Sequence, residues 1–432
     1  MLKNRLNNTV LKFFSYNGIV VLGKLIASFI VSKISAIYLG PSGYALVGNF
    51  KNILQGVIGI TASGFESGVI KYTAQYKEDK KAYNIVIASA LSLSIIISLL
   101  LGVFLFFFAE TISIYILKDI KYAFVFRVLA VFLPLVSLNY LMIYVFNGLQ
   151  NLKRYSSLII IGNILNALVV FFLIYFFNLK GALLASVLIP ALNFLCGLFF
   201  KDVRDVLIIF LLNIKHVSTV FLKSISTYVA MAAYSSILIS FTYLSVRNNI
   251  ISNLDIDNAG LWEAMNKISS FYMLFFTSLI TLYLLPKLAI NTTVKGYVNI
   301  MKSYFSFLIP FLMLFLLGVF FLRVFIVKIF LTSEFKLIES YFYLQLIGDF
   351  IKIIAFSLAY QFHAKKMVSF YLITDAVLYF SFYFLGTFLI DSFLLKGVFY
   401  AYIVSVLLYL ILVFIFIAYN NSNYLKNNVE KF

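Results

Sequence analysis

The sequence predicts an all-α polytopic membrane protein of about twelve transmembrane helices. Of its 432 residues, 63% are hydrophobic and 12% are charged, and the mean hydropathy is +1.02. A soluble chain of this length could not cover so much apolar surface with polar side chains. The bilayer is therefore the expected solvent for most of the chain.

The predicted spans are apolar segments of about 20 residues or more, the length that a helix needs to cross the hydrocarbon core. Connections between them are short, and none resembles a soluble catalytic domain. The spans fall near residues 16–39, 44–70, 83–108, 122–147, 155–177, 180–200, 219–246, 259–285, 303–331, 339–363, 369–390 and 394–419.

The basic residues between the spans predict their orientation. An even number of spans places both termini on one side, where 20 Lys and Arg residues fall, against 8 on the other side. Basic residues are enriched in cytoplasmic connections, so both termini are expected to be cytoplasmic. Because these residues are scattered between apolar segments, the net charge of +18 indicates membrane topology, and no nucleic-acid partner is expected.

The chain is expected to divide near its midpoint into two six-helix lobes. A polar stretch over residues 201–218 joins the sixth and seventh spans, which gives an N-terminal lobe over residues 1–215 and a C-terminal lobe over 216–432. A short internal repeat supports the division. The second and eighth spans each begin near a glycine, Gly43 or Gly260, that is followed six residues later by an asparagine. Duplicated transporter lobes show such internal symmetry.

Several charges lie inside predicted spans, where a central charge costs about 2.5 to 3.5 kcal/mol and normally faces protein or a wet cavity. The basic residues outnumber the acidic ones, which suggests an anionic transported species such as a lipid pyrophosphate. The basic residues are Lys24, Lys33, Lys51, Arg127, Lys267 and Lys352, and the acidic ones are Glu66, Glu263, Asp349 and Asp375.

Two of these charged couples have helical spacing. Glu263 and Lys267 are four residues apart, and Asp349 and Lys352 are three apart, so each couple shares a helix face and is expected to neutralise itself. A purely structural role for both couples is the alternative to a role in transport, since paired charges ease membrane insertion.

Glu66 lies within a G-x-x-x-G pattern, between Gly64 and Gly68. Such glycines let two helices approach closely, and the carboxylate is expected on roughly the opposite face of the helix. It is expected to point into a cavity, or alternatively to pair with Lys71.

Five stretches of the chain resemble the Wzx-type flippases, a family that includes O-antigen translocases and the enterobacterial common antigen lipid III flippase. This family belongs to the multidrug/oligosaccharidyl-lipid/polysaccharide exporter (MOP) superfamily. The similar stretches follow one another through nearly the whole chain: 39–43 with 49–51, 68–76, 181–184 with 189–192, 260–262 with 283–286, and 345–352.

The resemblance implies two pseudo-symmetric six-helix lobes around a central basic cavity that opens to one membrane face at a time. It implies alternating-access export of an undecaprenyl-pyrophosphate-linked oligosaccharide, an O-antigen or related repeat unit, from the cytoplasmic to the periplasmic leaflet of the bacterial inner membrane. Coupling to H⁺ or Na⁺, and partnership with a polysaccharide polymerase and a chain-length regulator, are further expectations.

The expected cavity residues combine the charge inventory with this resemblance. We predict that Asn49, Lys24, Lys51, Lys267 and Lys352 bind the substrate. Lys51 stands where the family often has Arg, which keeps the charge and loses bidentate geometry. Lys267 stands where relatives are commonly uncharged.

The ion-coupling residues are expected to be Glu66 and Asp349, because an intramembrane carboxylate is the usual site for a coupling cation. No catalytic residue, metal site or cofactor is expected. His216 and His363 are far apart, and neither has a Cys or a pair of carboxylates near it in the sequence.

Two other functions are alternatives to this interpretation. A drug/cation antiporter of the same superfamily would prefer an acidic cavity. A membrane-embedded oligosaccharide polymerase or glycosyltransferase could use the D-x-D at Asp255 and Asp257, but this pair precedes a helix and is better explained as a cap. A polymerase would also need a long periplasmic loop, and the connections are short.

Overall fold

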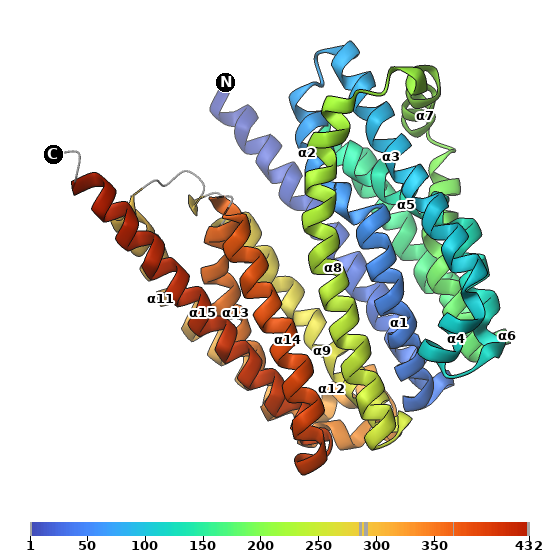
Figure 1. Cartoon of the computed structure of the whole chain (residues 1–432), viewed down its shortest axis with the longest axis vertical. Coiled ribbons are helices and arrows are strands. Elements are labelled where there is room, and N and C mark those ends of the chain that lie inside the picture. Colours follow the sequence, from blue (N-terminus) through green and yellow to red (C-terminus); the bar gives the residue numbers. More distant parts are fainter. Residues whose placement is uncertain (1, 285–286, 289–292, 366, 430–432) are drawn as a thin grey trace. The chain divides into compact units, whose positions relative to one another are not determined.

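The computed structural model describes residues 2–284, 287–288, 293–365 and 367–429 (Figure 1). In these residues the regular secondary structure is helical throughout, as predicted. In order along the chain, the helices are α1 (Leu2–Thr61), η1 (Ser63–Phe65), α2 (Glu66–Gln75), α3 (Lys80–Phe107), α4 (Ala109–Leu117), η2 (Ile120–Tyr122), α5 (Ala123–Gly148), α6 (Leu152–Gly197), α7 (Lys201–Asn213), η3 (Ile214–His216), α8 (Thr219–Asn253), α9 (Ile256–Leu279), η4 (Ile280–Leu284), α11 (Val294–Phe321), α12 (Arg323–Phe330), η5 (Ser333–Ser340), α13 (Phe342–Ala364), α14 (Val368–Phe393) and α15 (Leu395–Val429).

The prediction of about twelve membrane spans is confirmed. Nine helices in the described ranges are long and apolar enough to cross a bilayer. Two of them, α1 and α6, are each a pair of spans joined at a kink. The remaining span is α9, which has 24 residues but carries Asp257, Glu263 and Lys267 and is not among the nine.

The kinks in α1 and α6 occur where one residue adopts a left-handed backbone. Gly40 has φ 61° and ψ −172°, and Pro41 follows it. A glycine tolerates this conformation without steric cost, and a proline starts a new helix because its φ is already helical. In α6 the turn is made by Asn178, with φ 48° and ψ −128°, and Asn is among the residues that visit positive φ most readily.

The two halves of the chain repeat the same order of elements. In the first half a long helix, a short helix, a 3₁₀ turn and a long helix follow as α3, α4, η2 and α5, and in the second half the same series is α11, α12, η5 and α13. The sequence Leu-Lys-Gly recurs at residues 179–181 and 395–397, and in both places the residue before it, Asn178 or Leu394, has positive φ. This repetition matches the predicted pseudo-symmetric lobes.

The structure differs from the predicted spans at several ends. The span predicted over residues 44–70 ends at Thr61, and α2 is a separate helix after the 3₁₀ turn η1. The predicted polar linker over residues 201–218 contains the helix α7, whose buried Val203, Val206 and Phe210 belong to the core cluster of the first half. These short helices are amphipathic, so hydropathy alone merges them with spans or loops.

The described residues form two compact units. Unit 1 comprises Met1–Leu39 and Leu46–Phe241, and unit 2 comprises Gly40–Ala45 and Thr242–Phe432. The short segment Gly40–Ala45, at the kink of α1, therefore belongs with the second half of the chain. The lobe boundary at residues 215 and 216 stays a prediction.

Unit 1 is held together by apolar packing and by a few buried polar contacts between helices. Ser98 and Ser137 share a hydrogen bond of 2.8 Å between α3 and α5, and Asn193 Nδ2 on α6 donates to Asn139 Oδ1 on α5 at 2.8 Å. The α5 and α6 helices lie side by side (Figure 1). Such interhelical hydrogen bonds replace the partners that water would supply elsewhere.

Unit 2 places α15 beside both α14 and α13 (Figure 1). Its α9 helix begins at a cap predicted from the sequence, because Asp255 Oδ1 accepts from the Asn258 backbone N–H at 2.6 Å. Near that end, Gly260 lies so close to the Pro41 backbone that a Cβ atom there would overlap the Pro41 carbonyl. Gly260 is therefore the residue that lets α9 approach the kink of α1.

We expect Gly260→Ala to destabilise the protein by about 1 to 3 kcal/mol, because a rigid backbone group must move to admit the methyl group. Gly318→Ala is the matched control, since Gly318 is also helical and a Cβ there meets nothing within 4 Å. The melting temperature of the purified protein in detergent should fall for Gly260→Ala and stay level or rise slightly for Gly318→Ala. Equal melting temperatures for the two variants would contradict the close approach.

Candidate functional site

The most elaborate polar site in unit 2 surrounds the carboxylate of Asp349 on α13. Asp349 is 0% exposed. Both of its carboxylate oxygens accept hydrogen bonds. Oδ2 accepts from Ser269 Oγ at 2.7 Å and from the Tyr272 hydroxyl, and Oδ1 accepts from the Tyr402 hydroxyl at 2.6 Å. Gln345 Nε2 lies 3.1 and 3.2 Å from the two oxygens. Four neutral side chains thus donate hydrogen bonds to one buried carboxylate.

These donors come from three helices. Ser269 and Tyr272 lie one turn apart on α9, Gln345 precedes Asp349 by one turn on α13, and Tyr402 lies on α15. The carboxylate therefore ties α9, α13 and α15 together. A buried hydrogen bond to a charged group contributes about 1.5 to 3 kcal/mol, and leaving the charge without one costs more.

The expected pairing of Asp349 with Lys352 does not occur. The Lys352 ammonium lies over two aromatic rings, 5.4 Å from the centroid of Phe356 and 5.4 Å from that of Tyr402. A cation is attracted to the face of an aromatic ring. Their three-residue spacing places Asp349 and Lys352 on one face of α13. The Asp349 carboxylate nevertheless accepts hydrogen bonds from tyrosines of the neighbouring helices α9 and α15.

A second polar site in unit 2 contains an ion pair that the sequence did not predict. The Glu263 carboxylate accepts from Arg247 Nη2, although Lys267 was its expected partner. Arg247 is 0% exposed and lies inside α8, whereas the sequence placed it in a connection after residue 246. Its guanidinium carbon is 5.3 Å from the Trp262 ring centroid. Arg247 therefore contacts two neighbouring side chains of α9, the Glu263 carboxylate and the Trp262 ring.

Lys267 lies on the same helix as Glu263, partly buried, with its ammonium 5.4 Å from the centroid of Phe271. The predicted substrate lysines of unit 2, Lys267 and Lys352, thus lie near the Asp349 site in the sequence. Lys267 lies two residues before Ser269, and Lys352 lies three after Asp349. A role for either lysine in substrate binding stays a prediction.

The predicted substrate residues of unit 1 lie on α1. Lys24 and Lys51 are exposed. Asn49 is instead 0% exposed, and its Nδ2 donates to the Ile116 carbonyl of α4 at 2.9 Å. Asn49 therefore ties α1 to α4, and its part in binding a substrate also stays a prediction.

Glu66 is exposed at the first turn of α2, and the glycines around it behave as the G-x-x-x-G pattern predicts. A Cβ on Gly64 would come within 3.0 Å of the Val229 Cα, and one on Gly68 within 3.4 Å of the Tyr228 ring. Both glycines thus approach α8, and Glu66 points elsewhere. The two glycines are not in one α-helix, because Gly64 belongs to the 3₁₀ turn η1.

The alternative pairing of Glu66 with Lys71 is not formed. Lys71 Nζ donates instead to the Tyr228 hydroxyl at 3.4 Å and lies 5.1 Å from the centroid of the Tyr72 ring. Lys71 lies outside the long apolar spans, and the hydrogen bond with Tyr228 raises the pKa of its ammonium above the usual range.

Sequence reasoning found Asp349 but missed most of its partners. Gln345 could have been noticed, because it precedes Asp349 by four residues on one helix face. Ser269, Tyr272 and Tyr402 are 80, 77 and 53 residues away from Asp349, and no local pattern connects them. Over the described residues, no cluster of three or more His, Cys, Asp or Glu side chains could hold a metal ion.

Solved structures of transporters share this fold. A multidrug resistance MATE family transporter of the MOP superfamily in an inward-facing conformation matches with a TM-score of 0.77, at 15% identity, over 93% of this chain and 96% of that chain. The lipid II flippase MurJ in an inward closed conformation matches with a TM-score of 0.68, at 16% identity, over 94% and 87%. The chain thus has the fold of MOP superfamily transporters.

The comparison with curated proteins matches flippases in particular. The lipid III flippase of Escherichia coli (strain K12) is 24% identical over 353 residues, which cover 82% of this chain and 84% of that protein. The lipid III flippase of Shigella flexneri matches over the same length at the same identity. No family profile matches the chain. The predicted resemblance to the lipid III flippases is therefore confirmed.

We expect Tyr402→Phe to lower the stability of the protein by about 1 to 3 kcal/mol, because the Asp349 carboxylate then loses a buried donor. Tyr297→Phe is the matched control, since the Tyr297 hydroxyl is buried with no hydrogen-bond partner among the described residues. Thermal unfolding in detergent should show a clear loss for Tyr402→Phe and no loss for Tyr297→Phe. A neutral Tyr402→Phe would show that the carboxylate does not depend on this donor.

Proposed function

We propose that the protein is a flippase that moves an undecaprenyl-pyrophosphate-linked oligosaccharide from the cytoplasmic to the periplasmic leaflet. The observation that carries the proposal is the sequence similarity to lipid III flippases along 82% of the chain. The substrate is an O-antigen or related repeat unit, and transport proceeds by alternating access.

The charges of the spans support an anionic substrate. Lys24 and Lys51 in unit 1 and Lys267 and Lys352 in unit 2 place cations within helices that would otherwise be apolar. A pyrophosphate carries several negative charges and accepts hydrogen bonds from ammonium groups. These four lysines, together with Asn49, are the proposed substrate-binding residues.

The rival proposal is a drug/cation antiporter, and the MATE-like fold alone would permit it. The lysine-rich spans argue against it, because an organic cation would meet like charge. A membrane-embedded oligosaccharide polymerase has less support, since Asp255 of the D-x-D pair caps α9.

We place the protein in the bacterial inner membrane with both termini in the cytoplasm, on the basis of the 20 to 8 distribution of basic residues. A polysaccharide polymerase and a chain-length regulator would act on the exported units. These partners follow from the class of substrate.

Coupling to H⁺ or Na⁺ is proposed at Asp349, with Glu66 as a second carboxylate. Around Asp349 the hydroxyls of Ser269, Tyr272 and Tyr402 all lie within hydrogen-bonding reach of one carboxylate. A proton or a Na⁺ ion arriving there would replace a donor on the carboxylate and loosen one of the three helices. Occupancy of the site would in this way change the packing of α9, α13 and α15.

Loss of the gene is expected to make an undecaprenyl-linked oligosaccharide accumulate in the inner leaflet, as measured by lipid extraction. Complementation with Lys→Ala variants at positions 24, 51, 267 and 352 should restore less surface polysaccharide than wild type at equal protein level, and Lys→Arg should be milder because it keeps the charge. Lys180→Ala, an exposed lysine outside the set, is the control and should complement fully. Full export by all four alanine variants would contradict the proposed lysine roles, and an unchanged lipid pool after gene loss would contradict the function.

A further inference from the structure

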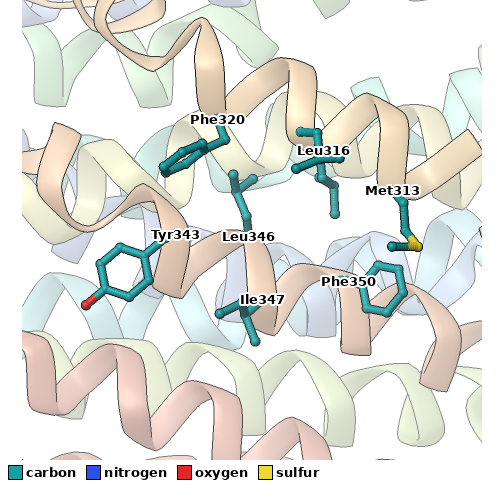
Figure 2. A pocket seen from close by; sticks show the side chains of 8 residues that line it. Met313, Leu316, Phe320, Tyr343, Leu346, Ile347 and Phe350 are labelled. Atoms are coloured by element: carbon teal, nitrogen blue, oxygen red, sulfur yellow. The ribbon is translucent and has the colours of Figure 1, made fainter.

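An open apolar groove runs between α11 and α13 in unit 2. Its volume is about 390 Å³. Figure 2 shows side chains from both helices along it, among them Met313, Leu316 and Phe320 from α11 and Leu346, Ile347 and Phe350 from α13. Neither helix offers a charged side chain to its lining, so the groove suits a hydrocarbon chain.

A polar cleft of about 500 Å³ adjoins the end of α11 and the start of α13. Arg323, the first residue of α12, lines it together with Lys336, Glu339 and Ser340 of the 3₁₀ segment η5. Two cations less one carboxylate leave a net charge of about +1 when all three groups are ionised. This cleft suits a headgroup with one negative charge.

The groove and the cleft are adjacent. The Arg323 guanidinium carbon lies 4.2 Å from the ring centroid of Phe320, and Arg323 Nη1 donates to the Phe320 carbonyl at 2.8 Å. Phe320 lines the groove, and Arg323 lines the cleft. On the other side, Tyr343 of the groove lies at the start of α13 and follows Ser340, the last residue of η5 in the cleft, by three residues. An apolar slot therefore ends at a basic mouth.

The residues around this mouth are typical of a membrane interface. Large apolar side chains on both sides of Arg323 are more than half exposed: Phe321, Leu322, Val324 and Phe325. Leu337 beside Lys336 is also 53% exposed. Exposed apolar residues interspersed with Arg and Lys are what an interfacial segment presents to lipid.

We propose that this site binds one anionic phospholipid, with a hydrocarbon chain in the groove and the phosphate between Arg323 and Lys336. A phosphodiester carries one negative charge and matches the net charge of the cleft. A pyrophosphate carries more charge than the cleft can balance, so the site is distinct from the one proposed for the transported substrate. The bound lipid would fill the space between α11 and α13 and fix α12 at the interface.

Native mass spectrometry of the full-length, delipidated protein in detergent tests this proposal, with dioleoyl phosphatidylglycerol as the probe. Dioleoyl phosphatidylcholine is the comparison lipid, because it has the same chains and no net charge. We expect phosphatidylglycerol to bind at least about tenfold more tightly, since both lipids offer the same phosphate but the choline cation of phosphatidylcholine is repelled by the net positive cleft. Arg323→Gln with Lys336→Gln should remove that preference, and Leu317→Trp, at a half-exposed position of the groove, should weaken binding of both lipids.

Matched controls separate the site from general charge and folding effects. Lys396→Gln removes an exposed lysine of unit 2 outside the cleft and should leave the preference intact. Arg323→Lys with Lys336→Arg keeps both charges and should retain it as well. An undiminished preference in the double glutamine variant would overturn the proposal. Tighter binding of undecaprenyl pyrophosphate, lost in the same variant, would overturn it too by assigning the site to the substrate.

Discussion

A polar group inside a bilayer has no water to bind, so it must find its partners within the protein. Asp349 shows how unit 2 meets this constraint, because three hydroxyls and an amide from α9, α13 and α15 surround one buried carboxylate. The cost of an unpaired charge makes these four contacts mutually dependent. The packing of three helices is thereby linked to the state of one ionisable group.

The same constraint explains the second buried charge of unit 2. Arg247 lies wholly inside the protein, with Glu263 as its ion-pair partner and the Trp262 ring within cation–π distance. Breaking such a pair by removing one partner typically costs about 3 to 5 kcal/mol. In unit 1, hydroxyl and amide pairs such as Asn139 with Asn193 serve the same purpose with neutral groups.

Much of the fold could be predicted from the sequence, because long apolar runs have few alternatives to helices in lipid. The turn at Gly40 and Pro41 and the cap at Asp255 were also recognisable, since the residues themselves favour those conformations. The short helices α2, α4, α7 and α12 were not, because a hydropathy profile merges α2 and α12 with neighbouring spans and leaves α4 and α7 in the predicted connections. The repeated series of elements in the two halves emerges only when these helices are seen.

The candidate site was predictable only in part. The sequence identified Asp349 and Glu263 as buried charges and paired them with lysines on their own helices. Helical spacing places such residues on one face, but it carries no information about donors from other helices. Tyr272, Tyr402 and Arg247 were the better partners because they approach from α9, α15 and α8.

The most direct test of the account is transport of an undecaprenyl-pyrophosphate-linked oligosaccharide by purified protein in proteoliposomes, with and without imposed H⁺ and Na⁺ gradients. We expect wild-type protein to move the lipid-linked sugar faster when one of these gradients is present. Asp349→Asn should move it more slowly and should no longer respond to that gradient. The account would be contradicted if wild-type protein moved no lipid-linked sugar, or if Asp349→Asn kept both the wild-type rate and its dependence on the gradient.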